Sequence, residues 1–261
     1  MLMLNMKKNA FLILIICFAC FFVLLHALQR TGDFEDIYLI NLERRNDRLQ
    51  RFLSGWHSSD MKRYSITKFN AVDGSLINTN TIPMTDMAKL ELKQLDTLGF
   101  RYKHYQLTKG AIGCYLSHVK VWETIMQSNT NSALIFEDDA SIPPNCGARI
   151  KRAIRDIPDD WDIILFGKHC SDCEDKGKYV KVNRFILLHT YMISKRGILK
   201  IMEEGNLFPI SQQLDAYLSE ISYILNIYAS KENIVKQAES RTDIQAPLVK
   251  NNQMNDRMFL K

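Results

Sequence analysis

Residues 133–140 read Ala-Leu-Ile-Phe-Glu-Asp-Asp-Ala, four apolar side chains followed directly by three acids. A continuous apolar run of this length is typical of a short strand that is buried on both faces, as in a parallel sheet. The acids mark the point where the strand leaves the core. In open α/β sheets, ligands bind at the carboxyl ends of strands. The stretch therefore predicts an α/β fold with a binding site at this strand end.

Glu137, Asp138 and Asp139 carry the chemistry of that site. Side chains alternate along an extended backbone, so Glu137 and Asp139 should point one way and Asp138 the other. Carboxylates this close repel one another unless a cation neutralises them. Oxygen-only ligands favour Mg²⁺, Mn²⁺ or Ca²⁺ over Zn²⁺. A solvated acidic turn is the alternative, and the three acids alone do not decide between the two.

An apolar segment lies near the start of the chain, which has 261 residues, 46% of them hydrophobic, and a formal charge of +5. Residues 11–28 are almost wholly apolar and long enough to span a bilayer. Lys7 and Lys8 precede them, which favours a cytoplasmic N-terminus under the positive-inside rule. We expect a signal anchor, with a cleaved signal peptide as the alternative.

The expected organisation is that of a single-pass type II membrane protein, whose globular domain lies in the ER or Golgi lumen if the cell is eukaryotic. The chain has no basic stripe with interleaved aromatic residues, so nucleic acid is not an expected partner. The expected parts are a tail over residues 1–10, a transmembrane anchor over 11–28, a linker over 29–35, a globular domain over 36–246 and a C-terminal tail over 247–261.

Basic residues follow the first predicted strand, which covers residues 36–42. We expect an amphipathic helix over 43–56, with Arg44 and Arg48 on one face of its first turn. Positive side chains do not suit the positive end of a helix dipole. An anionic ligand docked between the two arginines would account for them. A solvated charged face is an equally good interpretation.

Asp73 and His118 are further candidates for ligand contacts. Asp73 belongs to an Asp-Gly pair after the second predicted strand, where it marks a turn or hydrogen-bonds a ribose hydroxyl. A helix is predicted to end near Gln127, and two glycines near its start permit close backbone approach. His118 lies in this helix, where a lone histidine is more often structural than catalytic.

The second half of the chain alternates predicted strands and helices, which indicates one layered α/β domain with a mostly parallel sheet. Cys170 and Cys173 lie in a charged loop predicted over 168–181. No second ligand pair stands at zinc-finger spacing, so a local disulfide or two free thiols are expected there. We expect helices at 149–157 and 195–204 and strands at 161–167, 185–194 and 224–228.

These segments together resemble glycosyltransferase family 25, which includes lipopolysaccharide sugar transferases and procollagen galactosyltransferases. The resemblance covers residues 36 to 245, and its weight comes from the order and spacing of several short motifs. The matching segments are 40–42 with Arg44, Arg45 and Arg48, then 70–74, 110–114, 116–118, 134–139, 189–194, Asp215, and a weaker tail at 235–237 and 243–245.

The resemblance implies a GT-A type, Rossmann-like nucleotide-sugar-binding domain. It implies transfer of a hexose, galactose or glucose, from a UDP-sugar to a hydroxyl of a glycan, a lipopolysaccharide or other lipid-linked sugar, or a protein, with inversion. A Mn²⁺ or Mg²⁺ cofactor would be held by Glu137 and Asp139. Asp215 would be the catalytic base, although a helix cap or a surface acid is an equal alternative. The expected donor-binding residues are Asn41, Arg44, Arg45, Arg48, Asp73, Ser117, His118, Asp138 and His189.

Two other functional classes stay open. A sugar nucleotidyltransferase also uses a metal at a strand end, but it normally has a Gly-rich basic loop after the first strand, and no such loop follows Leu42. A catalytically inactive binding or adhesion protein would keep the fold after losing its activity. The presence of all three acids at 137–139 favours the enzyme.

Overall fold

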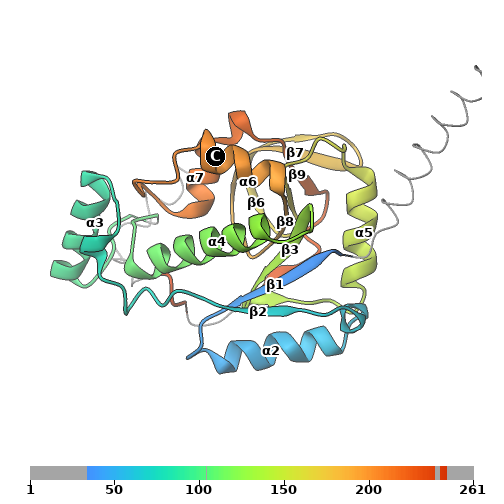
Figure 1. The fold of residues 1–261 in the computed structure, drawn as a ribbon, viewed down its shortest axis with the longest axis horizontal. Helices are drawn as coiled ribbons and strands as arrows, with labels where there is room; N and C mark the ends of the chain where they lie inside the picture. Colours follow the sequence, from blue (N-terminus) through green and yellow to red (C-terminus); the bar gives the residue numbers. More distant parts are fainter. Residues whose placement is uncertain (1–33, 104, 239–241, 246–261) are drawn as a thin grey trace, which may run out of the picture. The chain divides into compact units, whose positions relative to one another are not determined.

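The computed structural model describes residues 34–103, 105–238 and 242–245 (Figure 1). The expected anchor at 11–28 and the expected tail at 247–261 lie outside these residues. Within the described ranges, no helix combines the length and the apolar character that a membrane span requires. The described chain is an α/β domain, as the sequence predicts.

A mixed sheet of eight strands forms the centre of the domain, in the order β2-β1-β3-β8-β5-β9-β7-β6. Ala133 and Ile135 of β3 pack on one face, and Leu134 and Phe136 belong to the other. All four are buried, as the apolar run predicts. The strands are β1 (Asp36–Asn41), β2 (Thr67–Asn70), β3 (Ser132–Glu137), β5 (Ile163–Leu165), β6 (His169–Asp175), β7 (Tyr179–Ile186), β8 (Thr190–Ser194) and β9 (Ile227–Ser230).

The prediction of a mostly parallel sheet is wrong. Among the described strands, β1 runs parallel to β2 and β3, and β5 to β9, but the other four pairings in this sheet are antiparallel. The expected loop at 168–181 is the β6–β7 hairpin, whose tight turn contains Gly177 at a φ of 84°. A turn this short can join only antiparallel strands. The charges of β6 are those of an exposed edge strand.

Helices cover both faces of the sheet (Figure 1). Phe52 and Trp56 of α2 pack edge-to-face against Phe136 at ring-centroid distances of 5.6 and 5.8 Å. The opposite face, with Ile135, belongs to the main hydrophobic cluster, to which α4 contributes Trp122. The helices are α2 (Asn46–His57), α3 (Asp86–Leu98), α4 (Lys109–Gln127), α5 (Cys146–Asp156), α6 (Lys195–Glu203) and α7 (Leu214–Glu220).

Three local expectations are also settled. The first helix begins at Asn46, so Arg44 precedes it and cannot share its first turn with Arg48. The single strand expected over 185–194 is two strands, β7 and β8, separated by residues 187–189, of which Leu187 has a φ of 78°. A disulfide joins Cys170 to Cys173 on β6, which is the first of the two expected alternatives.

Asp162 ties three elements together at the start of β5. Its carboxylate accepts the backbone N–H of Asn226, next to β9, at 2.8 Å. Arg196 and Lys200 of α6 donate to the same carboxylate at 2.8 and 2.6 Å. Burial alone would raise the pKa of Asp162, but these hydrogen bonds outweigh it, and the pKa lies below its usual value.

We expect Asp162→Asn to lower the free energy of unfolding by about 2 kcal/mol near neutral pH, because it weakens buried charge-assisted hydrogen bonds. A folded-state pKa below the unfolded value stabilises the fold above the unfolded pKa of about 3.9, and this stabilisation disappears as pH falls through the folded value. The loss of unfolding free energy caused by Asp162→Asn, measured by urea unfolding, should therefore be smaller near pH 3 than at pH 7. The control is Asp86→Asn, whose fully exposed carboxylate should change stability by less than about 0.5 kcal/mol. Equal losses in both variants would contradict this role for Asp162.

Candidate functional site

A cleft lies at the carboxyl ends of β1 and β3 and consists of two adjoining cavities of about 370 and 230 Å³. Arg48, Cys114, His118 and Glu137 line both of them. Glu137 is the last residue of β3, so the strand identified from the sequence ends at the boundary between the two cavities.

Asp138 and Asp139 line different cavities, as expected, but both lie in the turn after β3, so strand alternation is not the cause of this division. Glu137 and Asp139 both line the larger cavity, whereas Asp138 lines the smaller one. Each carboxylate has a hydrogen-bond partner, and Arg48 also lies 3.7 Å from Asp139. Asp138 accepts hydrogen bonds from Asn41 at 2.7 Å and from Arg48 at 3.0 Å. These partners stabilise Asp138 as an anion, although burial still raises its pKa.

A chain of hydrogen bonds orients Glu137. Its carboxylate is 3.0 Å from Nε2 of His118, and Nδ1 of the same ring is 2.8 Å from the hydroxyl of Tyr191. The indole N–H of Trp122 donates to that hydroxyl at 2.9 Å. Burial opposes ionisation of Glu137, but the hydrogen bond to His118 and the charges of His118, His189 and Arg48 together outweigh it, and the net effect is a lowered pKa. His118 is fully buried and acts here as a support for Glu137.

Asp139 has an unused acceptor atom. Its Oδ2 accepts a hydrogen bond from Gln237 at 3.0 Å, but its Oδ1 is buried and has no hydrogen-bond partner among the described residues. Burial and the adjacent charge of Glu137 raise the pKa of Asp139 to about 7. Buried polar atoms are nearly always paired. A divalent cation held by Glu137 and Asp139 would bind this oxygen and neutralise the charge of the two carboxylates. Two carboxylates are a donor set that fits Mn²⁺ or Mg²⁺.

Asp215 lies across the larger cavity, in the first turn of α7. Its carboxylate accepts the backbone N–H of Leu187 at 3.1 Å and that of Ala216 at 2.8 Å. Leu187 has a positive φ of 78°, which is rare for a branched side chain and often marks a functional site. Burial raises the pKa of Asp215. The cleft thus brings Asp215 to the same cavity as Glu137 and Asp139.

An arginine cluster borders the smaller cavity, but an acid not assigned from the sequence sits within it. Asp243 pairs with Arg44 at 2.6 Å, with Arg45, and with Arg48 at 3.7 Å. The predicted anion-binding position among the arginines is therefore occupied by a carboxylate of the chain itself. Its only sequence signal is the weak family match at 243–245.

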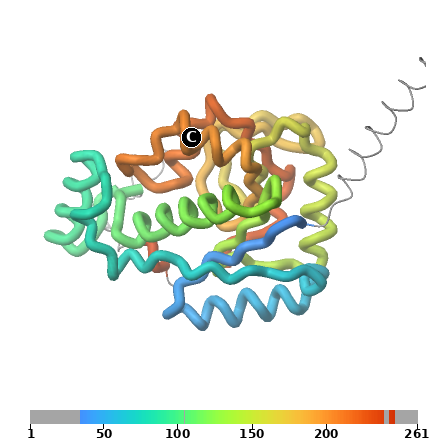
Figure 2. The backbone as a smooth tube through the Cα atoms, in the orientation of Figure 1, coloured from blue at the N-terminus to red at the C-terminus, as the bar shows by residue number. Residues whose placement is uncertain are grey.

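Residues 242–245 are the short red segment near the start of the green helix α4 in Figure 2, and they contact that helix end. The hydroxyl of Thr108, which caps α4, donates to the carbonyl of Ile244. A Cβ at Gly110 would lie 2.1 Å from the carbonyl oxygen of Asp243. The close approach expected at this glycine is therefore made by a neighbouring segment of the chain.

The structure separates the other predicted donor-binding residues into two groups. Asp73 lines the smaller cavity, where Arg44 donates to it at 2.6 Å. Ser117 also borders this cavity, but its hydroxyl holds backbone groups of Gly113 and Val72. The second group lines neither cavity within the described ranges and consists of Asn41, Arg45 and His189.

Asn41 and His189 support the site from behind. Asn41 is buried and holds Asp138. The ring of His189 is also buried, and its Nε2 lies 3.1 Å from the carbonyl oxygen of Val235. Its own carbonyl accepts the backbone N–H of Glu137 at 2.9 Å. These contacts keep His189 beneath the end of β3.

The motifs that meet at this cleft also define a family. The family described as Glycosyltransferase family 25 (LPS biosynthesis protein) matches residues 34–244. The chain belongs to glycosyltransferase family 25. Among curated family 25 proteins, procollagen galactosyltransferase 1 of Danio rerio is 29% identical over 179 residues, which are 65% of this chain and 28% of that protein.

Two further family 25 relatives are an Aedes aegypti protein named glycosyltransferase 25 family member and a human protein. The first is 30% identical over 64% of this chain and 28% of its own length. The second, inactive glycosyltransferase 25 family member 3, is 30% identical over 52% of this chain and 22% of its own length. This chain therefore spans less than a third of each of these relatives.

We expect Asp243→Asn to increase the affinity for pyrophosphate about tenfold, because a neutral side chain no longer competes for the arginines, and screening limits the gain. Titration calorimetry at constant salt measures it. The matched control is Asp47→Asn, which removes another carboxylate from Arg45 at a position 55% exposed and outside the cleft lining. Unchanged or weaker affinity in Asp243→Asn would mean that Asp243 does not occupy the anion position.

Proposed function

We propose that this family 25 member is a metal-dependent glycosyltransferase that moves a hexose, galactose or glucose, from a UDP-sugar to a hydroxyl of a glycan, lipid-linked sugar or protein, with inversion. The observation that carries the proposal is the meeting of Glu137 and Asp139 with Asp215 in one cavity. The names of the related procollagen galactosyltransferases support a hexose donor. A GT-A type domain is compatible with the α/β fold and its mixed sheet.

The smaller cavity suits the nucleotide part of the donor. Apolar side chains, including Ile40 and Val72, offer a surface for a base, and Asp73 offers an acceptor for a ribose hydroxyl. The start of α4 and the arginines at 44 and 48 border the same cavity. Helix N-termini and guanidinium groups both favour phosphate oxygens. A diphosphate would take the place of the Asp243 carboxylate among the arginines.

The larger cavity suits the reacting groups. Glu137 and Asp139 would hold a Mn²⁺ or Mg²⁺ ion, which when bound supplies positive charge for the departing diphosphate. His118 keeps Glu137 oriented and ionised for this task. Gln237 donates a hydrogen bond to Oδ2 of Asp139, and Oδ1 would be available to bind the metal ion.

Asp215 is the proposed base that removes the proton from the acceptor hydroxyl. Inversion requires this base on the side opposite the leaving group. The raised pKa of Asp215 makes the carboxylate a better proton acceptor near neutral pH. The backbone N–H groups of Leu187 and Ala216 hold its oxygens in position.

A catalytically inactive binding protein is the second candidate, because one relative with 30% identity is named as inactive. This chain keeps the three acids and Asp215, which supports the enzyme. The direct test is UDP release from UDP-galactose and UDP-glucose by the purified full chain, with Mn²⁺ and with EDTA. Activity with Mn²⁺ that EDTA abolishes supports the enzyme, and binding of UDP-sugar without any release supports the alternative.

We expect Asp139→Asn to reduce turnover about 10²–10³-fold, the usual cost of losing a preorganised electrostatic group. The melting temperature should stay the same or rise slightly, because the substitution relieves repulsion among carboxylates. Turnover is measured as a function of Mn²⁺ concentration, with Asp172→Asn on the exposed hairpin as the matched control. Wild-type turnover with the same Mn²⁺ dependence would refute the metal assignment.

We expect Asp215→Asn to abolish transfer and to leave UDP-sugar binding within about threefold of wild type, because the base acts on the acceptor. Calorimetry with the UDP-sugar and a turnover assay separate the two effects. Retained transfer would rule out Asp215 as the base. A parallel loss of donor binding would instead assign Asp215 to the donor site.

A further inference from the structure

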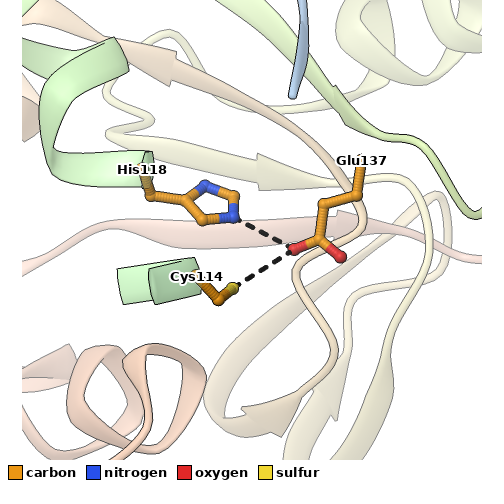
Figure 3. A group of neighbouring side chains, drawn as sticks. All are labelled: Cys114, His118 and Glu137. Atoms are coloured by element: carbon orange, nitrogen blue, oxygen red, sulfur yellow. Dashed lines mark hydrogen bonds and ion pairs between the residues drawn. The ribbon is translucent and has the colours of Figure 1, made fainter. Parts of the chain in front are cut away.

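Three side chains with metal-binding atoms converge inside the cleft (Figure 3). Cys114 and His118 stand four residues apart on α4 and so share one face of the helix. Both point toward Glu137 at the end of β3 (Figure 3). The Sγ–Oε1 distance is 4.0 Å, the Nε2–Oε1 distance is 3.0 Å, and all three ligand atoms lie within 4.8 Å of one another.

We propose that Cys114, His118 and Glu137 form a binding site for Zn²⁺. Bond lengths of about 2.0–2.3 Å place the ligand atoms of a tetrahedral zinc ion about 3.4–3.6 Å apart. The observed separations reach this arrangement through side-chain shifts of about 1 Å or less. Three protein ligands leave the fourth position open, and Cys114 and Glu137 line both cavities, so that position faces the cleft.

The surroundings of His118 suit a metal ligand. Histidine ligands usually bind a metal through one ring nitrogen while the other is held by a hydrogen bond. Nδ1 of His118 lies 2.8 Å from the Tyr191 hydroxyl, which Trp122 holds in turn. A phenol hydroxyl donates and accepts, so Tyr191 serves either tautomer of His118. In the tautomer protonated at Nδ1, the Nε2 lone pair is free for Zn²⁺, so the ring proton moves from Nε2 to Nδ1 and the hydrogen bond from Nε2 to Glu137 is given up. The thiol proton of Cys114 passes to solvent as the thiolate binds.

The ligand types separate this site from the oxygen site of Glu137 and Asp139. Thiolate and imidazole favour Zn²⁺, whereas two carboxylates favour Mn²⁺ or Mg²⁺. Both sites use Glu137, so Zn²⁺ at the cysteine site withdraws this carboxylate from the other ion. Zn²⁺ therefore inhibits the transfer proposed above by competition with Mn²⁺. Only this inhibition depends on the proposed function, and Zn²⁺ binding does not.

Co²⁺ is the spectroscopic probe, because a thiolate bound to tetrahedral Co²⁺ gives a sulfur-to-metal charge-transfer band in the near ultraviolet. The full chain, freed of metal by chelation, is titrated with Co²⁺ and then with Zn²⁺ or Mn²⁺. We expect one Co²⁺ per chain with this band, displaced by Zn²⁺ and not by equal Mn²⁺. Absence of the band, or its displacement by equal Mn²⁺, would overturn the proposal.

Two sets of variants test whether Cys114 supplies the thiolate that produces the band. Cys114→Ala should lose the band and bind Zn²⁺ at least about 100-fold more weakly, with a melting temperature near that of wild type. Asp139→Asn and the double change Cys170→Ser/Cys173→Ser should keep the band, since neither alters a proposed ligand. A band that persists in Cys114→Ala would refute the site. The band and the Zn²⁺ affinity are measured without turnover, so a catalytically inactive chain would still give them. The experiment therefore distinguishes failure of the proposed function from failure of this site.

Discussion

Repulsion among three adjacent carboxylates at the end of β3 is the constraint on which the cleft depends. The fold meets it by giving each acid a partner from a different element. His118 of α4 holds Glu137, Arg48 of α2 pairs with Asp138, and Gln237 of β10 (Lys236–Gln237) holds Asp139. The partners lie between 19 and 98 residues away from the acids along the chain. Correct packing of α2, α4 and β10 is therefore a condition for a usable site.

The same arrangement explains why the cleft has two unlike halves. Asp138 and Asp139 lie in the turn after β3 and line different cavities. Asp138 pairs with Arg48, whereas Asp139 lines the cavity that Asp215 also lines. One half therefore contains the arginines. The other gathers the carboxylates of Glu137, Asp139 and Asp215. Glu137 lines both halves, so the two proposed metal sites share this residue.

Local patterns predicted the parts of the fold that depend on local physics. The buried strand at 133–136 and helix α4 follow from side-chain periodicity, and the family resemblance supplied Asp215. Strand direction was not predictable in this way, because an apolar run has the same pattern in a parallel or an antiparallel pairing. Asp243 and Gln237 were missed as cleft residues, since their partners are 198 and 98 residues distant in sequence.

The distance in sequence between Arg45 and Asp243 has a consequence for the protein as it is being made. The two residues are 198 positions apart. At a synthesis rate of about 5–20 residues per second, the arginines precede their acid by about 10–40 seconds. During that interval the arginines have the acids made before Asp243, among them Asp47, Asp73 and Asp138. The arginine cluster therefore reaches the charge balance of the folded domain only after Asp243 has been added.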